Sequence, residues 1–299
     1  MKGKRDLLTL EDLRAQGILA VLDRADELKA LRRSGDPMPK PLAGKSIGLI
    51  FEKASTRTRV SFEVGVFELG GHPVVLNAKD TQMGRGEPIE DTARVLSRYL
   101  HAIVIRTFSD ELLAKLAKYA SVPVINALTD GGHPCQILAD LQTVRERKGT
   151  LEGLRYAWIG DGNNVANSWI EACALLNLEL TLACPEGYDP SVPVDGKKIK
   201  LVRDPRAAIE GADVVITDVW ASMGQEAEAE ARKKAFAGFI VSPETMKGAR
   251  AGAMVLHCLP AHRGEEIDGV YLDGPDSAVW DEAENRLHAQ KALLEYLVR

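Results

Sequence analysis

Short apolar runs alternate with amphipathic segments along most of the 299-residue chain. In the first half, apolar runs of strand length lie at 46–51, 73–77, 102–106 and 123–126. The segments between and after them have apolar residues at helical spacing, and we expect helices near 57–69, 88–100, 109–120 and 135–148. Strands separated by helices of this length favour right-handed crossovers, so the pattern predicts a parallel sheet.

The same pattern then begins again. Apolar runs predict strands at 155–159, 179–183, 213–217 and 254–257, and a helix at 164–176. We therefore expect an α/β fold of two domains, each a parallel β-sheet flanked by helices, with bounds 1–148 and 149–281. The last segment, 282–299, has leucines at helical spacing, and we expect this helix to pack back on the first domain. The charged run 225–234 is typical of a solvated helical face.

Composition narrows the class of protein. Apolar residues make up 45% of the chain, enough for real cores. The formal charge is 38 − 43 = −5, so nucleic acid and anionic membranes are not expected partners. No apolar stretch approaches the ~20 residues that a membrane helix needs. The four cysteines, at 135, 173, 184 and 258, are widely spread without a CxxC pair, which favours free thiols in a reducing cytoplasm over disulfides or zinc.

The strongest candidate site is the run Ser-Thr-Arg-Thr-Arg at 55–59. It opens a predicted helix, whose first N–H groups lack internal partners and whose dipole is positive at that end. Ser55, Thr56 and Thr58 add neutral donors, and Arg57 adds a planar fork that matches a phosphate. The run therefore indicates an anion site, with an ordinary N-cap and solvated arginines as the alternative.

Other polar motifs follow the predicted strands, and ligands bind beyond the carboxyl ends of parallel strands. Arg106 ends one strand and could face the same phosphate as Arg57. His133 and Gln136, in a His-Pro-Cys-Gln run, could hydrogen-bond a carbonyl oxygen and an amide; a helix start with proline and no ligand is the alternative. A single histidine without a carboxylate partner does not favour a metal site.

A glycine-rich stretch at 160–165 lies between a predicted strand and a predicted helix, as a dinucleotide fingerprint requires. Val165, however, stands at the crowded position of the third glycine. The asparagines here, Asn167 among them, suit a small polar ligand better. The polar loop 80–87, which contains Gln82, is either an ordinary surface loop or a loop that reaches a neighbouring subunit.

Two later loops combine polar and apolar residues. Asp218 follows a predicted strand and could pair with a ligand ammonium group, and the Met223 that follows is an odd choice for an exposed loop. In 257–264, a cysteine–histidine nucleophile is one interpretation. Because adjacent residues of an extended segment point to opposite faces, His257 cannot easily act as the base for Cys258, so a binding role for Cys258 is more plausible.

Four motifs together resemble those of the carbamoyltransferase family, over nearly the whole chain. Ser-Thr-Arg-Thr-Arg at 55–59 and His-Pro-Cys-Gln at 133–136 resemble its carbamoyl-phosphate motifs. Asp218 with Ser-Met-Gly at 222–224, and His-Cys-Leu-Pro at 257–260, resemble motifs of the ornithine-specific branch. The aspartate-specific branch lacks both of these and carries a lysine in the loop that here holds Gln82.

The resemblance implies that the chain transfers a carbamoyl group from carbamoyl phosphate to L-ornithine, giving L-citrulline and phosphate without metal or organic cofactor. The reaction would serve either arginine biosynthesis or the degradative direction. It implies a homotrimer whose active sites are completed at subunit interfaces by the Gln82 loop. The implied catalytic residues are Arg57, Arg106, His133, Asp218 and Cys258. The residues implied to bind carbamoyl phosphate are Ser55, Thr56, Arg57, Thr58, Gln82, Arg106, His133, Gln136, Cys258, Leu259 and Arg286. Those implied to bind ornithine are Asn167, Asp218, Ser222 and Met223.

Three alternatives stay open. The same chemistry could act on putrescine or an acetylated ornithine, although those branches of the family depart at the Ser-Met-Gly loop. A nicotinamide-dependent dehydrogenase would use 160–165. A non-catalytic module would bind only a phosphate ligand or nucleic acid, and the acidic balance argues against nucleic acid.

Overall fold

A computed structural model describes residues 4–78, 81–221 and 228–298, and the chain forms two compact units. Unit 1 comprises Met1–Gln142 and Glu284–Arg299, and unit 2 comprises Thr143–Ala283. The boundaries between them fall inside two long helices, α5 (Pro134–Lys148) and α10 (Val279–Leu297). The end of α10 is thus grouped with unit 1.

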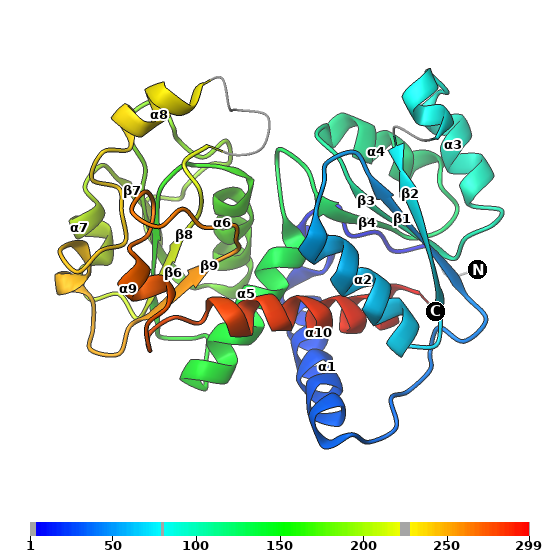
Figure 1. Ribbon diagram of the computed structural model, residues 1–299, viewed down its shortest axis with the longest axis horizontal. Coiled ribbons are helices and arrows are strands. Elements are labelled where there is room, and N and C mark those ends of the chain that lie inside the picture. Colours follow the sequence, from blue (N-terminus) through cyan, green and yellow to red (C-terminus); the bar gives the residue numbers. More distant parts are fainter. Residues whose placement is uncertain (1–3, 79–80, 222–227, 299) are drawn as a thin grey trace. The chain divides into compact units, whose positions relative to one another are not determined.

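Unit 1 is built on a four-stranded parallel sheet in the order β2-β1-β3-β4 (Figure 1). Its strands are β1 (Ser46–Phe51), β2 (His72–Asn77), β3 (Ala102–Arg106) and β4 (Val124–Leu128). Its own helices are η1 (Leu10–Asp12), α1 (Arg14–Ser34), α2 (Thr56–Glu68), η3 (Gln82–Arg85), α3 (Ile89–Leu96) and α4 (Asp110–Tyr119). β1, β3 and β4 are buried almost throughout, as strands covered on both faces are.

The strand order explains which helices cover which face of this sheet. α2 leads from β1 to its neighbour β2, whereas α3 leads from β2 back past β1 to β3, so right-handed crossovers put the two helices on opposite faces. α3 and α4 form one core with sheet residues such as Ile50 and Ile103. α10 lies beside α2 (Figure 1), and a Cβ on Gly65 of α2 would lie 3.2 Å from the Lys291 side chain. Glycine therefore permits the close approach of these two helices.

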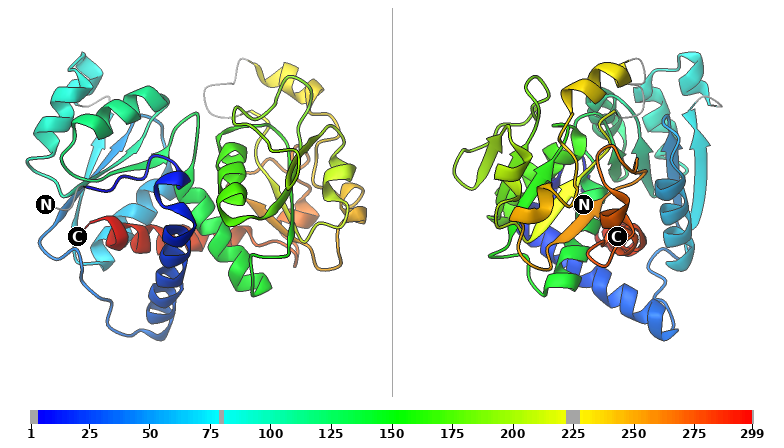
Figure 2. Two further views of the ribbon diagram at one scale, coloured as in Figure 1. Left: turned by 180° about the vertical axis from the view of Figure 1, so that it is seen from behind. Right: turned by 60° about the vertical axis from the view of Figure 1, so that its left-hand side comes forward.

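Unit 2 is built on a five-stranded parallel sheet in the order β7-β6-β5-β8-β9. Figure 2 draws the sheet and helices of this unit from two further sides. Its strands are β5 (Arg155–Ile159), β6 (Glu179–Ala183), β7 (Ile199–Val202), β8 (Val214–Thr217) and β9 (Met254–His257). Its helices are α6 (Asn164–Leu176), α7 (Pro205–Ile209), α8 (Ala229–Ala235), η5 (Thr245–Gly248) and α9 (Gly269–Leu272). Residues such as Ile159, Val215 and Phe236 form its core.

The predicted α/β class and the two parallel sheets are confirmed. All eight predicted strands are present, with ends that differ by no more than two residues. β7 and α1 were not predicted, and α3 ends at Leu96 rather than near 100. The prediction of a solvated helical face near 225–234 is wrong for Arg232 of α8, which is buried against Asp161 with an N–O distance of 2.7 Å.

Helix α2 forms as predicted, but two of the three apolar residues whose spacing predicts it, Val60, Val64 and Phe67, do not face the core. Val60 and Phe67 are 50% and 73% exposed, whereas Phe62 and Val66 are buried. The buried face of α2 packs on the sheet and α10, so the spacing identifies the helix correctly and its buried side incorrectly. The exposed side of α2 carries these two apolar side chains together with the ion pair of Arg59 and Glu63.

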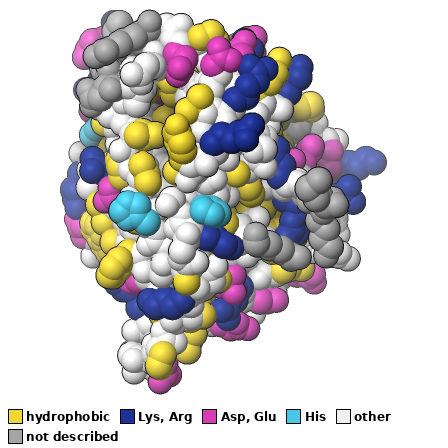
Figure 3. Space-filling model, turned by 90° about the vertical axis from the view of Figure 1, so that its right-hand side faces the viewer, with side chains coloured by type: hydrophobic (Ala, Val, Ile, Leu, Met, Phe, Trp, Pro, Cys, Tyr) yellow, Lys and Arg dark blue, Asp and Glu magenta, His cyan; other side chains and the backbone are white. Residues whose placement is uncertain are grey.

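The surface mixes side chains of both charges. On the face drawn in Figure 3, lysine, arginine and acidic side chains are interspersed with hydrophobic ones. Among the described residues, every helix is too short or too polar to cross a membrane.

Candidate active site

The candidate anion site lies where the strand order of unit 1 reverses. The loops after β1 and β3 leave this point on adjacent strands, which is where open parallel sheets bind ligands. Ser55 caps α2, because its backbone is extended and its side chain accepts a hydrogen bond from the Thr58 N–H at 3.2 Å. Arg106 ends β3 opposite Phe51, the last residue of β1. The two motifs therefore meet at one edge of the sheet.

Arg286 reaches the same site from α10. Its Nη2 donates to Thr58 Oγ1 at 3.3 Å and its Nη1 donates to Gln136 Oε1 at 2.5 Å. Thr58, Gln136 and Arg286 are all buried. The resemblance alone had pointed to this arginine, because its local sequence looks like an ordinary helix surface. The structure brings it together with the residues of both carbamoyl-phosphate motifs.

Gln290, one turn further along α10, holds this arginine, and sequence reasoning missed it. With its amide oriented so that both ends find partners, its oxygen accepts from Arg286 Nε and Nη2 at 3.2 and 3.0 Å. Its nitrogen donates to Ser61 Oγ at 2.6 Å, and Ser61 donates to the Arg57 carbonyl at 2.7 Å. A continuous set of hydrogen bonds thus links Arg286 with the first turn of α2.

His133 lies within this cluster of positive charge. Burial, followed by the charges of Arg286, Arg106 and Arg57, holds the pKa of His133 well below its ordinary 6.5. The imidazole is therefore neutral at physiological pH and can donate one hydrogen bond without carrying charge. Burial also raises the pKa of the Cys135 thiol to about 12, so this cysteine is not a nucleophile.

The remaining predicted residues of unit 1 are on the surface. Thr56 is the first residue of α2 and is exposed, and Gln82 is exposed on η3. No described contact connects Gln82 with Arg57 or His133 within the chain.

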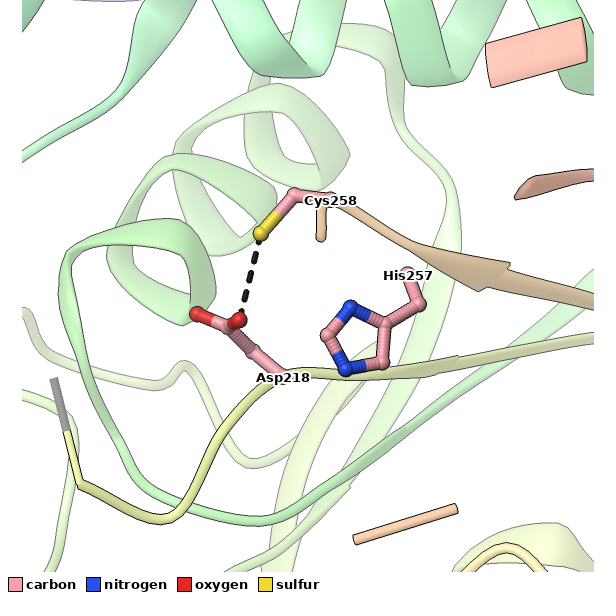
Figure 4. A group of neighbouring side chains, drawn as sticks. All are labelled: Asp218, His257 and Cys258. Carbon is pink, nitrogen blue, oxygen red and sulfur yellow. Dashed lines mark hydrogen bonds between the residues drawn. The ribbon is translucent and has the colours of Figure 1, made fainter. Parts of the chain in front are cut away.

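The candidate ornithine site of unit 2 lies beyond β5, β8 and β9. The strand order reverses between β5 and β8, and Asp218 follows β8 at that point. The Cys258 thiol, after β9, donates to Asp218 Oδ1 at 3.1 Å, and Figure 4 shows it pointing at this carboxylate. Asn163 donates to the other oxygen of Asp218 at 2.8 Å. Asp218 is thus held on both sides.

His257 has other partners, as the sequence argument against a cysteine–histidine pair requires. Its Nδ1 accepts from the Leu259 N–H at 2.9 Å, so its Nε2 carries the hydrogen that is shared with Glu266 Oε1 at 3.0 Å. Leu259 has a φ of 60°, and this bond fixes its left-handed backbone. His257 therefore shapes the loop that carries Cys258 and Leu259.

Within the part of the chain that the structure describes, two groups of side chains have spacings that could accept a metal ion. Ligand atoms of Asp218, His257 and Cys258 lie within 4.8 Å of one another. Both ring nitrogens of His257 already serve Leu259 and Glu266, so a metal would have to break one of these bonds. The second group is His262, Glu265 and Glu266, in which Lys233 pairs with Glu265 at 2.9 Å. Neither donor set is arranged as a preformed metal site.

Asn167 lies on α6, and its side chain is hydrogen-bonded to Ser191 rather than to Asp218. Its amide donates to Ser191 Oγ at 2.8 Å and accepts from the Ser191 N–H at 3.1 Å. The asparagine that contacts Asp218 is instead Asn163, whose Oδ1 also caps α6. Ser222 and Met223, the other residues expected to bind ornithine, lie outside the described residues.

The glycine-rich stretch at 160–165 has a structural explanation. A Cβ on Gly162 would lie 2.2 Å from the backbone nitrogen of Pro190 and 2.3 Å from the Asp189 carbonyl carbon. Glycine is therefore required by the close approach of the chain's own loop. This packing accounts for Gly162 without a dinucleotide.

Two family models match most of the chain. The carbamoyl-P binding domain of aspartate/ornithine carbamoyltransferase matches residues 5–146, and the Asp/Orn binding domain matches residues 152–297. The chain belongs to the aspartate/ornithine carbamoyltransferase family. The resemblance drawn from the four motifs is confirmed at the level of the family.

Relatives within the family match over nearly their full length. The ornithine carbamoyltransferase of Halorhodospira halophila is 54% identical over 297 residues, covering 98% of this chain and 99% of the relative. That of Acidothermus cellulolyticus is 55% identical over 304 residues, with 98% and 96% covered. The solved ornithine carbamoyltransferase from Pyrococcus furiosus has a TM-score of 0.94 at 50% identity, covering 99% and 97% of the chains. The structure from Burkholderia thailandensis has a TM-score of 0.91 at 45% identity, covering 98% of each.

The family models and the structure divide the chain differently at its end. The model of the Asp/Orn binding domain extends to residue 297, whereas the structure groups Glu284–Arg299 with unit 1. Arg286 thus belongs by sequence to one domain of the family and by its contacts to the site of the other.

Proposed function

We propose that the protein transfers the carbamoyl group of carbamoyl phosphate to the δ-amino group of L-ornithine, giving L-citrulline and phosphate. The observation that carries this proposal is the grouping of Arg57, Arg106 and Arg286 around a neutral His133 in unit 1. Family membership and the names of the relatives support the same reaction.

The arginines of unit 1 suit the acyl phosphate. Planar guanidinium groups bind phosphate oxygens in pairs, and the α2 N-terminus adds Ser55, Thr56 and Thr58 as donors. Thr58, Arg106 and His133 are proposed to donate to the carbamoyl oxygen as it becomes negative in the tetrahedral adduct. Loss of one such preorganised donor costs ~3 kcal/mol in comparable acyl transfers.

Asp218 and Cys258 of unit 2 suit a cationic amino acid. Buried Asp218 is proposed to hold, together with Asn167, Ser222 and Met223, the α-amino and α-carboxylate groups of ornithine. Cys258 is proposed to lie near the attacking nitrogen. Asn163 joins this set because it bonds directly to Asp218. Gln136 and Leu259 are assigned to the carbamoyl NH₂.

The reaction needs a neutral amine, although a free alkylammonium has a pKa of about 10.4. The δ-nitrogen attacks the carbamoyl carbon, the bond from that carbon to the phosphate oxygen breaks, and the departing phosphate takes the proton lost by nitrogen. The chain need supply no metal, cofactor or dedicated base for this balance.

We also propose that the active unit is a homotrimer. Phe67 and Tyr99 of unit 1 are 73% and 70% exposed, and large exposed aromatic side chains of this kind fit contact with a second copy. Gln82 would then act on the neighbouring subunit. The four free cysteines fit a reducing cytoplasm, and citrulline formation fits arginine biosynthesis.

The decisive assay supplies carbamoyl phosphate with L-ornithine, putrescine, N-acetylornithine or L-aspartate, and measures ureido product and phosphate. We expect one phosphate for each citrulline and a kcat/KM for ornithine about 100 times that for each other amine. A preference for N-acetylornithine, whose α-nitrogen is an uncharged amide, would contradict the role assigned to Asp218. Absence of product with every amine, together with binding of a nicotinamide cofactor, would support the dehydrogenase instead.

A further inference from the structure

Asp140 lies on α5 one helical turn after Gln136, and both side chains are only 1% exposed. Gln136 Nε2 donates to Asp140 Oδ1 at 2.8 Å. On a helix surface such a pair would be an ordinary local contact. In a buried site it has a further consequence, because a carboxylate accepts hydrogen bonds and therefore selects the NH₂ end of the Gln136 amide.

Arg286 selects the opposite end of the same amide. A guanidinium group can only donate, and Arg286 Nη1 donates to Gln136 Oε1 at 2.5 Å. Gln290 holds this arginine in turn by accepting from its Nε and Nη2. With an acceptor at one end and a donor at the other, the amide of Gln136 has one orientation. Its oxygen lies on the side of Arg286 and Thr58.

We propose that Asp140 is a positioning residue that makes the anion site specific for a carbamoyl donor. It holds the Gln136 side-chain oxygen toward the acyl group. This oxygen uses one lone pair to accept from Arg286 and has a second lone pair for the carbamoyl N–H. This inference rests on the proposed function. A reversed amide would present NH₂ to NH₂ and make no hydrogen bond.

Asp140 therefore controls which acyl phosphate the site accepts, according to the group attached to the carbonyl carbon. Acetyl phosphate has the same phosphate and carbonyl as carbamoyl phosphate, but its methyl group cannot donate. A site built to pair a hydrogen-bonding group rejects an analogue that lacks it. Loss of Asp140 should weaken the binding of carbamoyl phosphate and leave the binding of acetyl phosphate and inorganic phosphate almost unchanged.

The first test is Asp140→Leu, with Asp26→Leu as the matched control. Asp26 of α1 also accepts from a glutamine amide of α5, Gln142 Nε2, at 3.0 Å. We expect Asp140→Leu to raise the KM for carbamoyl phosphate about tenfold. The inhibition constants for acetyl phosphate and inorganic phosphate should stay within about twofold, and Asp26→Leu should leave all three constants unchanged. An equal rise in all three constants for Asp140→Leu, or no rise, would overturn the inference.

The second test exchanges the two partners and decides the matter even if Asp140→Leu does not fold. Gln136→Glu alone places two carboxylates against each other and should lower kcat/KM for carbamoyl phosphate about 100-fold. Adding Asp140→Asn restores one donor–acceptor pair and leaves an oxygen toward Arg286, so we expect recovery to within about tenfold of the wild type. A double variant that is no better than Gln136→Glu would contradict the positioning role. Wild-type protein that forms no citrulline would instead refute the proposed function.

Discussion

The candidate anion site of unit 1 and the candidate ornithine site of unit 2, each called a half-site below, are built in different ways. In unit 1, Thr58, Gln136 and Arg286 come from α2, α5 and α10, and buried partners fix two of them: Gln290 holds Arg286, and Asp140 holds Gln136. In unit 2, Asp218 and Cys258 lie on loops beyond strand ends. A half-site fixed by helices is organised before its ligand arrives, and preorganised charge is what stabilises a developing oxyanion.

The two half-sites also differ in charge. Three guanidinium groups and a neutral imidazole meet in unit 1, whereas a buried carboxylate and a thiol meet in unit 2. The first set matches an anionic acyl phosphate and the second matches an amino acid with an ammonium group. Each half-site should therefore respond to mutation through its own substrate.

The largest effect should come from Arg57→Met, with Arg59→Met as its control on the same helix. Arg57 belongs to the cluster that lowers the pKa of His133, whereas Arg59 is exposed and pairs with Glu63 at 3.0 Å. We expect Arg57→Met to lower kcat/KM for carbamoyl phosphate about 1,000-fold, because it removes a charged phosphate ligand. Arg59→Met should stay within about threefold of the wild type. Equal losses in steady-state assays would refute the assignment of Arg57.

A smaller effect, on the use of ornithine rather than of carbamoyl phosphate, is expected from Cys258→Ala. The thiol donates to Asp218, so its loss should raise the KM for ornithine about tenfold and change the KM for carbamoyl phosphate much less. Cys258→Ser keeps a hydroxyl donor and should recover most of the lost affinity. A covalent adduct on wild-type Cys258, detected by mass spectrometry during turnover, would show a nucleophile instead.

Much of the first half-site was predictable because its residues follow strands that are neighbours in the sheet. Arg106 ends β3, Ser55 and Thr58 lie at the start of the helix that follows β1, and strand order decides that the ends of β1 and β3 are adjacent. Arg286 had no such local signal, since it comes from a helix far along the chain. Its place in the cluster depends on the packing of α10 beside α2, which no short motif records.

Buried polar residues on helices were the main gap in the sequence analysis. Along α10, Arg286, Gln290 and Lys291 are buried although their residue types are typical of a surface. They are buried because they pair with α2, Lys291 with Glu68 at 2.6 Å for example. Periodicity cannot distinguish such a helix from one with a solvated polar face. The same limitation made Val60 and Phe67 suggest the wrong face of α2.

The smallest expected effect concerns the stability of the fold in acid and comes from a second buried histidine of unit 1. His288 of α10 is fully buried, 3.6 Å from Glu284, and burial followed by the charges of Lys291 and Lys29 lowers its pKa to about 3. The unfolded chain binds a proton at this residue near pH 6.5, whereas the folded chain does not. Acidification from pH 7.5 to pH 5.5 therefore favours unfolding by about 1.4 kcal/mol through His288. In His288→Leu, the free energy of unfolding should therefore change by about 1.4 kcal/mol less between these two pH values. Urea unfolding followed by circular dichroism at both pH values measures this difference. An unchanged pH dependence would show that His288 binds its proton in the folded protein too.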